Sequence, residues 1–277
     1  MDDPAEKAKL FRELHVPGKP FVLANAHDVG TAKMLVALGA KAVATTSAGH
    51  AFALGRPDGG TVTRDEALDH AEDIVKAVSV PVSGDFENGF ADDPGGVAET
   101  VELAVEIGLA GCSIEDTTFD AGKPAYDIDI AVARIAAAVE AAEESGSDFV
   151  LTARADGVMT GAYDLAEGIA RLQAFEDAGA HCVYLPLPKD MNEISTICAS
   201  VSAPVNALCA GRFAQHSLAD FAKAGVARVS VGSALARVTH RMIHDVGGAM
   251  IAKGDFSGLK LGMGGDAVDT LLEKGGA

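Results

Sequence analysis

Residues 63–87, TRDEALDHAEDIVKAVSVPVSGDFE, contain one helix and one strand of a unit that the chain repeats along its length. The apolar residues of 63–78 recur with helical periodicity. Thr63, followed three residues later by Glu66, matches a capping box at the start of that helix. The β-branched run that comes next predicts a buried strand over 80–87. This stretch therefore predicts a helix that leads directly into a strand.

The same alternation extends over the whole chain. Helix-periodic segments separate short apolar runs, and several of them end at a glycine just before the next run. Eight strands alternating with helices predict an α/β fold of the (β/α)8 barrel class. A doubly wound sheet is the alternative, but it would need fewer strands and a glycine-rich fingerprint where this chain has HDVGTA. The expected strands are 20–26, 41–48, 80–87, 110–116, 149–156, 182–188, 204–210 and 227–233.

Length and composition suit a single domain over 1–277. The chain is 48% apolar and long enough to bury a large core. We predict a barrel over about 18–250 and a helical extension over 251–277. That extension is rich in glycine, and we expect it to pack outside the barrel or on a neighbouring subunit.

The charge of the chain limits its partners. A net charge of −18 argues against nucleic acid, because phosphate binding needs clustered Lys and Arg. No apolar run approaches the roughly 20 residues of a membrane span. The acidic N-terminus is unlike a secretory leader, and the four cysteines form no CxxC pair. We therefore expect a cytoplasmic protein with neither nucleic-acid nor membrane partners.

Carboxylates gather where the expected strands end, which is where barrel enzymes build their sites. Asp85 and Glu87 are two residues apart, so a strand would place them on one face, and Glu115 ends the next strand. Three converging carboxylates would repel one another, and a hard cation such as Mg²⁺ or Mn²⁺ would relieve that repulsion. The alternative interpretation is a set of salt bridges to Arg154.

Other residues at the strand ends suit a small carboxylate substrate. The fork of Arg154 can bind a carboxylate through two hydrogen bonds, although Arg154 can also pair with Asp156 or Glu115. The turn after the second strand can present N–H groups to an anion, or be an ordinary turn. Asp58 lies in a glycine-rich segment (55–66) that we expect to close over the barrel mouth. The candidate substrate-binding residues are Thr46, Ser47, Ala48, Gly49, Arg154 and Asn206, and the candidate catalytic residues are Asp58, Glu115 and Arg154.

Together these segments resemble the isocitrate lyase/phosphoenolpyruvate mutase superfamily. The resemblance implies that Asp85 is the direct Mg²⁺ ligand and that Glu87 and Glu115 hold metal-bound waters, with Asp58 close by. It also implies substrate-carboxylate binding by Ser47, Gly49 and Arg154, and a homodimer or homotetramer in which the last helix is exchanged between subunits. The segments that carry it are the S-x-G turn (47–49), GRPDG (55–59), DFENGF (85–90), IED (114–116) and TAR (152–154).

The chain also departs from that superfamily in two places. Its isocitrate and methylisocitrate lyases carry a K/R-C-G-H segment with a catalytic cysteine, where this chain has TTFDAGKPAYDID (117–129). Pro186 stands where those lyases have an acid and the phosphonate mutases a histidine. The chain thus resembles a short, divergent, 2-methylisocitrate lyase-like member. A retro-aldol cleavage needs a general base, which this segment with its cysteine usually supplies in that superfamily. Tyr126, Asp120 and Lys123 are the residues of the segment here that could take that role.

These residues predict a Mg²⁺-dependent lyase that cleaves a C–C bond of a small 2-oxo or 2-hydroxy carboxylate through a pyruvate-type enolate, as in oxaloacetate decarboxylases and isocitrate lyases. One alternative is C–P chemistry of the phosphonopyruvate hydrolase or carboxyphosphonoenolpyruvate/phosphoenolpyruvate mutase type. Another is a non-catalytic protein that binds 2-oxo acids. A Schiff-base aldolase would need a lysine at a strand end, whereas Lys189 lies beyond the sixth strand.

Overall fold

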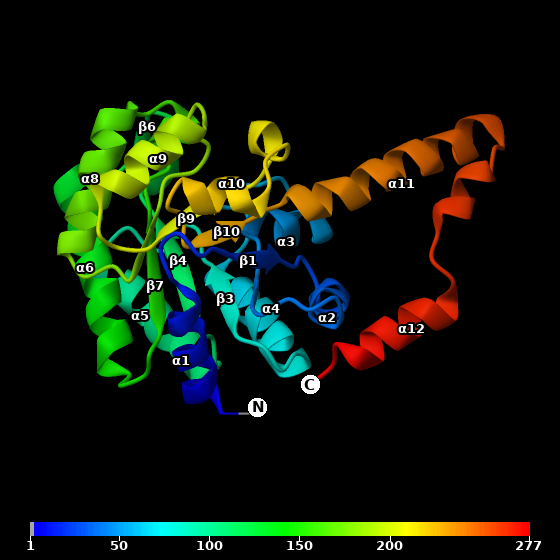
Figure 1. The fold of residues 1–277 in the computed structure, drawn as a ribbon, viewed down its shortest axis with the longest axis horizontal. Helices are drawn as coiled ribbons and strands as arrows, with labels where there is room; N and C mark the ends of the chain where they lie inside the picture. The colour runs from blue at the N-terminus through cyan, green and yellow to red at the C-terminus, as the bar shows by residue number, and fades with distance from the viewer. Residues whose placement is uncertain (1–2) are drawn as a thin grey trace.

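The computed structural model describes residues 3–277 and confirms the (β/α)8 barrel (Figure 1). Eight parallel strands close in the order β1-β10-β9-β8-β7-β4-β3-β2, and each lies inside a range predicted as a strand. The strands are β1 Phe21–Asn25, β2 Val43–Ala44, β3 Val82–Asp85, β4 Gly111–Glu115, β7 Val150–Arg154, β8 Cys182–Tyr184, β9 Val205–Leu208 and β10 Arg228–Ser230.

Helices alternate with these strands and surround the barrel. The predicted capping box is present, because Thr63 accepts from the Glu66 N–H while the Glu66 carboxylate accepts from the Thr63 N–H. The helices are α1 Pro4–Leu14, α2 Val29–Ala37, α3 Ser47–Ala53, α4 Arg64–Ala77, α5 Pro94–Glu106, α6 Ile128–Glu144, α7 Gly157–Thr160, α8 Leu165–Asp177, α9 Met191–Ser200, α10 Leu218–Lys223, α11 Ala234–Lys253 and α12 Gly265–Lys274, with 3₁₀ turns η1 Gly211–Phe213 and η2 Ser257–Leu261.

All eight strands are shorter than their predicted ranges, and in two of them the difference concerns candidate site residues. In the range 41–48, Ser47 already begins α3. β3 ends at Asp85, and Glu87 follows in a turn with φ 46°. The prediction that Asp85 and Glu87 share one strand face is therefore wrong. The turn after β3, rather than strand alternation, brings the second carboxylate to the barrel mouth.

Strand register places the polar side chains in two successive rows near the C-terminal ends of the strands. Asp85 pairs with Ser113 on β4, Glu115 pairs with Arg154 on β7, and Arg154 pairs with Tyr184 on β8. The alternate residues of these strands, such as Ile114 and Ala153, point outward and pack under the helices. The C-terminal strand ends thus present a polar rim above an apolar core.

β1 and β10 close the barrel by parallel backbone pairing. Asn25 adds side-chain hydrogen bonds across the same closure. Its Oδ1 accepts hydrogen bonds from the N–H groups of Val231 and Gly232, both at 2.9 Å. Its Nδ2 donates to the Thr45 carbonyl at 2.7 Å. One buried amide therefore joins segments about 200 residues apart in the chain.

Two features outside the barrel were not predicted in this form. Residues Thr117–Asp120 (β5) and Lys123–Ala125 (β6) form an antiparallel hairpin after β4. At the other end, α11 extends away from the barrel, and α12 returns to pack against α2 (Figure 1). No helix within residues 3–277 is both long and apolar enough to cross a bilayer.

Candidate active site

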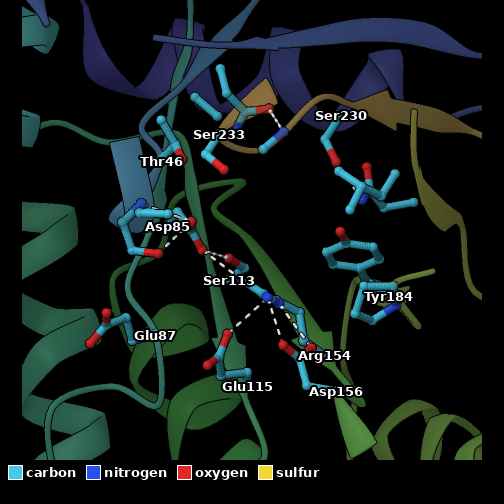
Figure 2. A pocket seen from close by; sticks show the side chains of 18 of the residues that line it. Thr46, Asp85, Glu87, Ser113, Glu115, Arg154, Asp156, Tyr184, Ser230 and Ser233 are labelled. Atoms are coloured by element: carbon cyan, nitrogen blue, oxygen red, sulfur yellow. Dashed lines mark hydrogen bonds and ion pairs between the residues drawn. The ribbon is translucent and has the colours of Figure 1, made fainter. Parts of the chain in front are cut away.

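A cavity of about 350 Å³ opens at the C-terminal ends of the strands (Figure 2). All eight strands of the barrel contribute residues to it, as do the segments that follow β2 and β3. The predicted site residues that line it are Thr46, Ser47, Ala48, Asp58, Asp85, Glu87, Glu115, Arg154 and Asn206.

Asp85 is the most heavily hydrogen-bonded carboxylate of the cavity. Its Oδ2 accepts from the backbone N–H of Ser47 at 2.9 Å and from the Ser47 hydroxyl at 3.0 Å. Its Oδ1 accepts from Arg154 Nη1 at 2.7 Å and from the Ser113 hydroxyl at 3.3 Å. The Asp85 N–H donates to Thr45 Oγ1 at 2.8 Å, which fixes the backbone below the carboxylate. Both oxygens of Asp85 are therefore fully engaged.

Arg154 lies among three carboxylates, as Figure 2 shows. Its Nη1 bonds Asp85 at 2.7 Å, and its Nη2 pairs with Glu115 at 2.9 Å. Nε and Nη2 also bond the two oxygens of Asp156, at 3.2 and 2.7 Å. The salt bridges considered as an alternative from the sequence are thus present. They do not exclude a substrate role, because the guanidinium still lines the cavity.

Glu87 and Asp58 connect the cavity to the glycine-rich segment 55–66. The Gly60 N–H donates to both Glu87 oxygens, at 3.2 and 3.3 Å. Burial raises the pKa of Glu87 to about 7, and the nearby carboxylates of Asp85 and Asp58 contribute in the same direction. Burial and then Asp85 raise the pKa of Asp58. Burial also raises the pKa of Glu115 well above its usual range. The carboxylates of this cavity therefore carry more negative charge than the guanidinium groups of the protein neutralise.

We expect Glu87→Gln to change how stability depends on pH. A carboxyl whose pKa is about 7 when folded and near 4.5 when unfolded holds its proton better in the folded state, so its contribution to stability is lost as pH rises from 4.5 to 7. Gln does not titrate. Above pH 7 the free energy of unfolding of the variant should therefore exceed that of the wild type by about 2 kcal/mol, after allowance for solvent screening. Urea unfolding from pH 4.5 to 8.5 measures this, and parallel curves for the two proteins would contradict the assignment.

The first turn of α3 forms one edge of the cavity. Thr46 is its N-cap and accepts from the Gly49 N–H at 3.3 Å, while Ser47 directs its N–H at Asp85. Gly49 is not among the residues that line the cavity. A Cβ at position 49 would lie 2.5 Å from Thr46 Cγ2 and 2.9 Å from His27 Cβ. Its role in substrate binding remains a prediction, whereas close packing already explains the glycine.

Gly49→Ala should therefore destabilise the protein, even though alanine favours a helix. Overpacking of this kind costs about 1–3 kcal/mol. Gly30→Ala is the matched control, because a Cβ there meets its nearest atom, Asp28 Oδ1, at an ordinary 3.5 Å. Chemical denaturation should show a lower free energy of unfolding for Gly49→Ala and an unchanged one for Gly30→Ala. Equal stability of both variants would show that the turn relaxes freely.

The wall opposite the carboxylates contains polar side chains that sequence reasoning only partly found. Asn206 Nδ2 donates to Ser230 Oγ at 2.9 Å, and Arg228 Nε donates to Asn206 Oδ1 at 2.9 Å. Tyr184 lies on the same side of the cavity in Figure 2. Arg228 begins its strand, so the rule that sites form at strand ends could not identify it. Ser113 was also missed, although it precedes Glu115 by two residues on the same strand face.

The β5–β6 hairpin supplies Thr117 and Phe119 to the cavity. Phe119 contacts the glycine-rich segment, because a Cβ at Gly60 would lie 3.3 Å from its ring. The candidate replacements for the missing base do not line the cavity. Tyr126 is buried and donates to Asp92, and Lys123 pairs with Asp127 at 2.7 Å on the surface.

The charge of this site favours a divalent cation, although the described side chains do not form a complete coordination shell for one. Within residues 3–277, no three His, Cys, Asp or Glu side chains are grouped closely enough to hold a metal by themselves. Mg²⁺, however, usually keeps several waters and needs only one or two direct carboxylates. Five lining carboxylates against two guanidiniums leave the negative charge that such an ion would neutralise; they are Asp58, Asp85, Glu87, Glu115 and Asp156, against Arg154 and Arg228. The donor set therefore suits a water-rich Mg²⁺ site at Asp85.

Comparison with known proteins is consistent with this geometry. The family model for phosphoenolpyruvate phosphomutase matches residues 11–251. An oxaloacetate decarboxylase of Paraburkholderia xenovorans (strain LB400) is 31% identical over 230 residues, 80% of this chain and 73% of that protein. A crystal structure of a candidate lyase/mutase from Burkholderia cenocepacia J2315 is 44% identical with a TM-score of 0.93, covering 96% of this chain and 95% of that one.

A phosphonopyruvate hydrolase, solved in complex with oxalate and Mg²⁺, has a TM-score of 0.84 and covers 96% of this chain and 94% of that one. At 23% identity this likeness shows a shared fold alone.

Proposed function

Because the chain belongs to the phosphoenolpyruvate phosphomutase family, we propose that it is a Mg²⁺-dependent lyase. Its reaction would cleave a C–C bond of a small 2-oxo or 2-hydroxy carboxylate and leave a pyruvate-type enolate. The observation that carries this proposal is the grouping of Asp85, Arg154 and the first turn of α3 around one cavity. It combines a cation-holding carboxylate with two kinds of anion-binding donor.

The roles of the residues follow from their positions. Asp85 would hold the cation directly, and Glu87 and Glu115 would act through water. The cation supplies positive charge that stabilises an enolate oxygen. Arg154 would bind the substrate carboxylate through Nη1, because Asp156 holds Nε and Nη2. The Ser47 N–H holds Asp85 at the adjoining edge of the site. The substrate is then held by preorganised charges that need little rearrangement as the bond breaks.

Decarboxylation of a 2-oxo diacid is the reaction that these residues support best. Loss of CO₂ from such an acid leaves the enolate without the removal of a proton by the protein. A retro-aldol cleavage would need a general base, and the residues of the β5–β6 segment considered for that role lie outside the cavity.

A turnover screen tests this proposal. Oxaloacetate, methylisocitrate, dimethylmalate and phosphonopyruvate should each be assayed with and without Mg²⁺. We expect Mg²⁺-dependent release of CO₂ or cleavage with at least one diacid. Turnover of phosphonopyruvate alone would favour C–P chemistry. Mg²⁺-dependent binding of oxalate without turnover of any compound would favour a 2-oxo acid binding protein.

The exposed apolar side chains of α11, of η2 and of the segment between them support a homo-oligomer. Val238, Ile243, Ile251, Phe256 and Leu261 are each 60–85% exposed. Burial of such side chains is worth about 25 cal/mol per Å². We propose that a second copy covers them by exchange of α11, the last helix of the barrel, in a dimer or tetramer, while α12 stays packed on α2 of its own chain. Light scattering of the protein in solution would show the oligomer, and a monomer at micromolar concentration would contradict it.

A further inference from the structure

The hydrogen bonds of Asp85 bear on how it can serve a cation. Its two oxygens accept from four donors: the Ser47 N–H, the Ser47 hydroxyl, the Ser113 hydroxyl and Arg154 Nη1. A cation held directly by this carboxylate must replace at least one of them. The Ser47 donors belong to a capped helix turn, and the Ser113 contact is long at 3.3 Å. Arg154 is the only charged donor of the four, and like charges would repel it from a cation.

Arg154 has a second anchor that does not involve Asp85. Its Nε and Nη2 bond both oxygens of Asp156, whose side chain is only 2% exposed. The Asp156 N–H donates to Asp116 Oδ1 at 2.8 Å. Asp116 in turn accepts from Arg171 Nη1 at 3.0 Å and from the Tyr163 hydroxyl at 2.6 Å. The guanidinium is therefore held on one side by a buried chain of contacts that leads to α8.

We infer that Arg154 Nη1 and a divalent cation compete for Asp85, and that Asp156 is the positioning residue that keeps the guanidinium in place when Nη1 is released. The inference rests on the proposed function and adds that the cation binds before the substrate. Once a cation takes Asp85, Nη1 is free to donate to the substrate carboxylate. Cation and substrate should then increase each other's affinity by the same factor, as linkage requires.

The first test measures Mg²⁺ binding alone, by calorimetry, in the wild type and in Arg154→Met. If the guanidinium competes with the cation, its removal should tighten Mg²⁺ binding about five-fold, equivalent to about 1 kcal/mol. Arg64→Met is the matched control, because it breaks a carboxylate pair of the same 2.7 Å length, with Glu99, outside the cavity. It should leave the Mg²⁺ affinity unchanged. Equal or weaker Mg²⁺ binding by Arg154→Met overturns the competition.

Removal of a positive charge also strengthens cation binding at a distance, so a structural readout is needed beside the affinity. A crystal structure of the wild-type protein with Mg²⁺ should show Nη1 beyond ion-pair distance of Asp85, with both contacts to Asp156 retained. A cation bound at Asp85 with the 2.7 Å contact to Arg154 intact would overturn the inference. This readout also decides the question if Arg154→Met does not fold.

The second test concerns Asp156. Oxalate is a planar dicarboxylate that mimics the pyruvate enolate. Its affinity for the protein is measured at saturating Mg²⁺. Asp156→Asn replaces one of the two accepting oxygens by an NH₂ donor, so it cannot keep both parallel contacts to Nε and Nη2 of Arg154. Oxalate binding should therefore weaken about ten-fold, a change that corresponds to about 1.4 kcal/mol. Unchanged oxalate affinity would assign Asp156 to stability alone. These are binding measurements, so they stand even if the turnover screen finds no substrate and the proposed function fails.

Discussion

Asp85→Asn should abolish the Mg²⁺-dependent reaction. We expect turnover of the best substrate to fall by at least about 10³-fold, because the change removes the carboxylate charge that holds the cation on which the enolate depends. The neutral side chain keeps the shape of Asp85 and can still accept from Ser47. The loss should therefore be one of charge rather than of fold. Steady-state kinetics with varied Mg²⁺ and a thermal-shift titration measure it.

Asp164→Asn is the control for this variant. Asp164 caps α8 on the surface, where asparagine caps equally well, and it does not line the cavity, so the same charge is removed outside the site. Its kinetics and its Mg²⁺-dependent thermal shift should match those of the wild type. If Asp85→Asn retained the wild-type thermal shift with Mg²⁺, Asp85 would not be the cation ligand and the proposed site would be wrong.

The largest effect on stability is expected from Arg171→Met. Arg171 is 5% exposed and pairs with Asp116, whose side chain is 1% exposed, at 3.0 Å. Its removal leaves a buried carboxylate without its cation, which typically costs about 3–5 kcal/mol. The denaturation midpoint in urea should fall accordingly, with no change in the slope of the transition.

The double variant Asp116→Asn/Arg171→Met distinguishes loss of the pair from loss of packing. With both charges removed, the buried site no longer holds an unpaired ion. The double variant should then be more stable than the sum of the two single changes predicts. Strict additivity would mean that the pair contributes nothing and that the side-chain volume of Arg171 accounts for the loss.

The sequence predicted the parts of this molecule that depend on local pattern. Strands and helices follow from apolar periodicity, and the cluster of Asp85, Glu115 and Arg154 follows because parallel strands end at one rim. The position of Glu87 was predicted by the wrong route, since it depends on a left-handed turn rather than on strand alternation.

What the sequence did not reveal depends on contacts between distant segments. Gly49 is required because the side chains of His27 and Thr46 pack so closely against its Cα that no Cβ fits there. The β5–β6 hairpin has short, mostly polar and half-buried strands that lack an apolar alternation. The four donors on Asp85 come from three different elements, and no spacing within one segment predicts how they share its two oxygens.

The closure of the barrel through Asn25 has a consequence for how the protein folds. The donors on its Oδ1 lie 206 and 207 residues further along the chain, so this contact cannot form until most of the chain has been synthesised. Contacts of such long sequence separation slow folding, because their loop-closure entropy is lost before any contact energy is gained. A nascent chain would present the β1 edge unpaired until β10 emerges. The cavity would then be among the last parts of the molecule to form, and a chain truncated before residue 231 should have no binding activity.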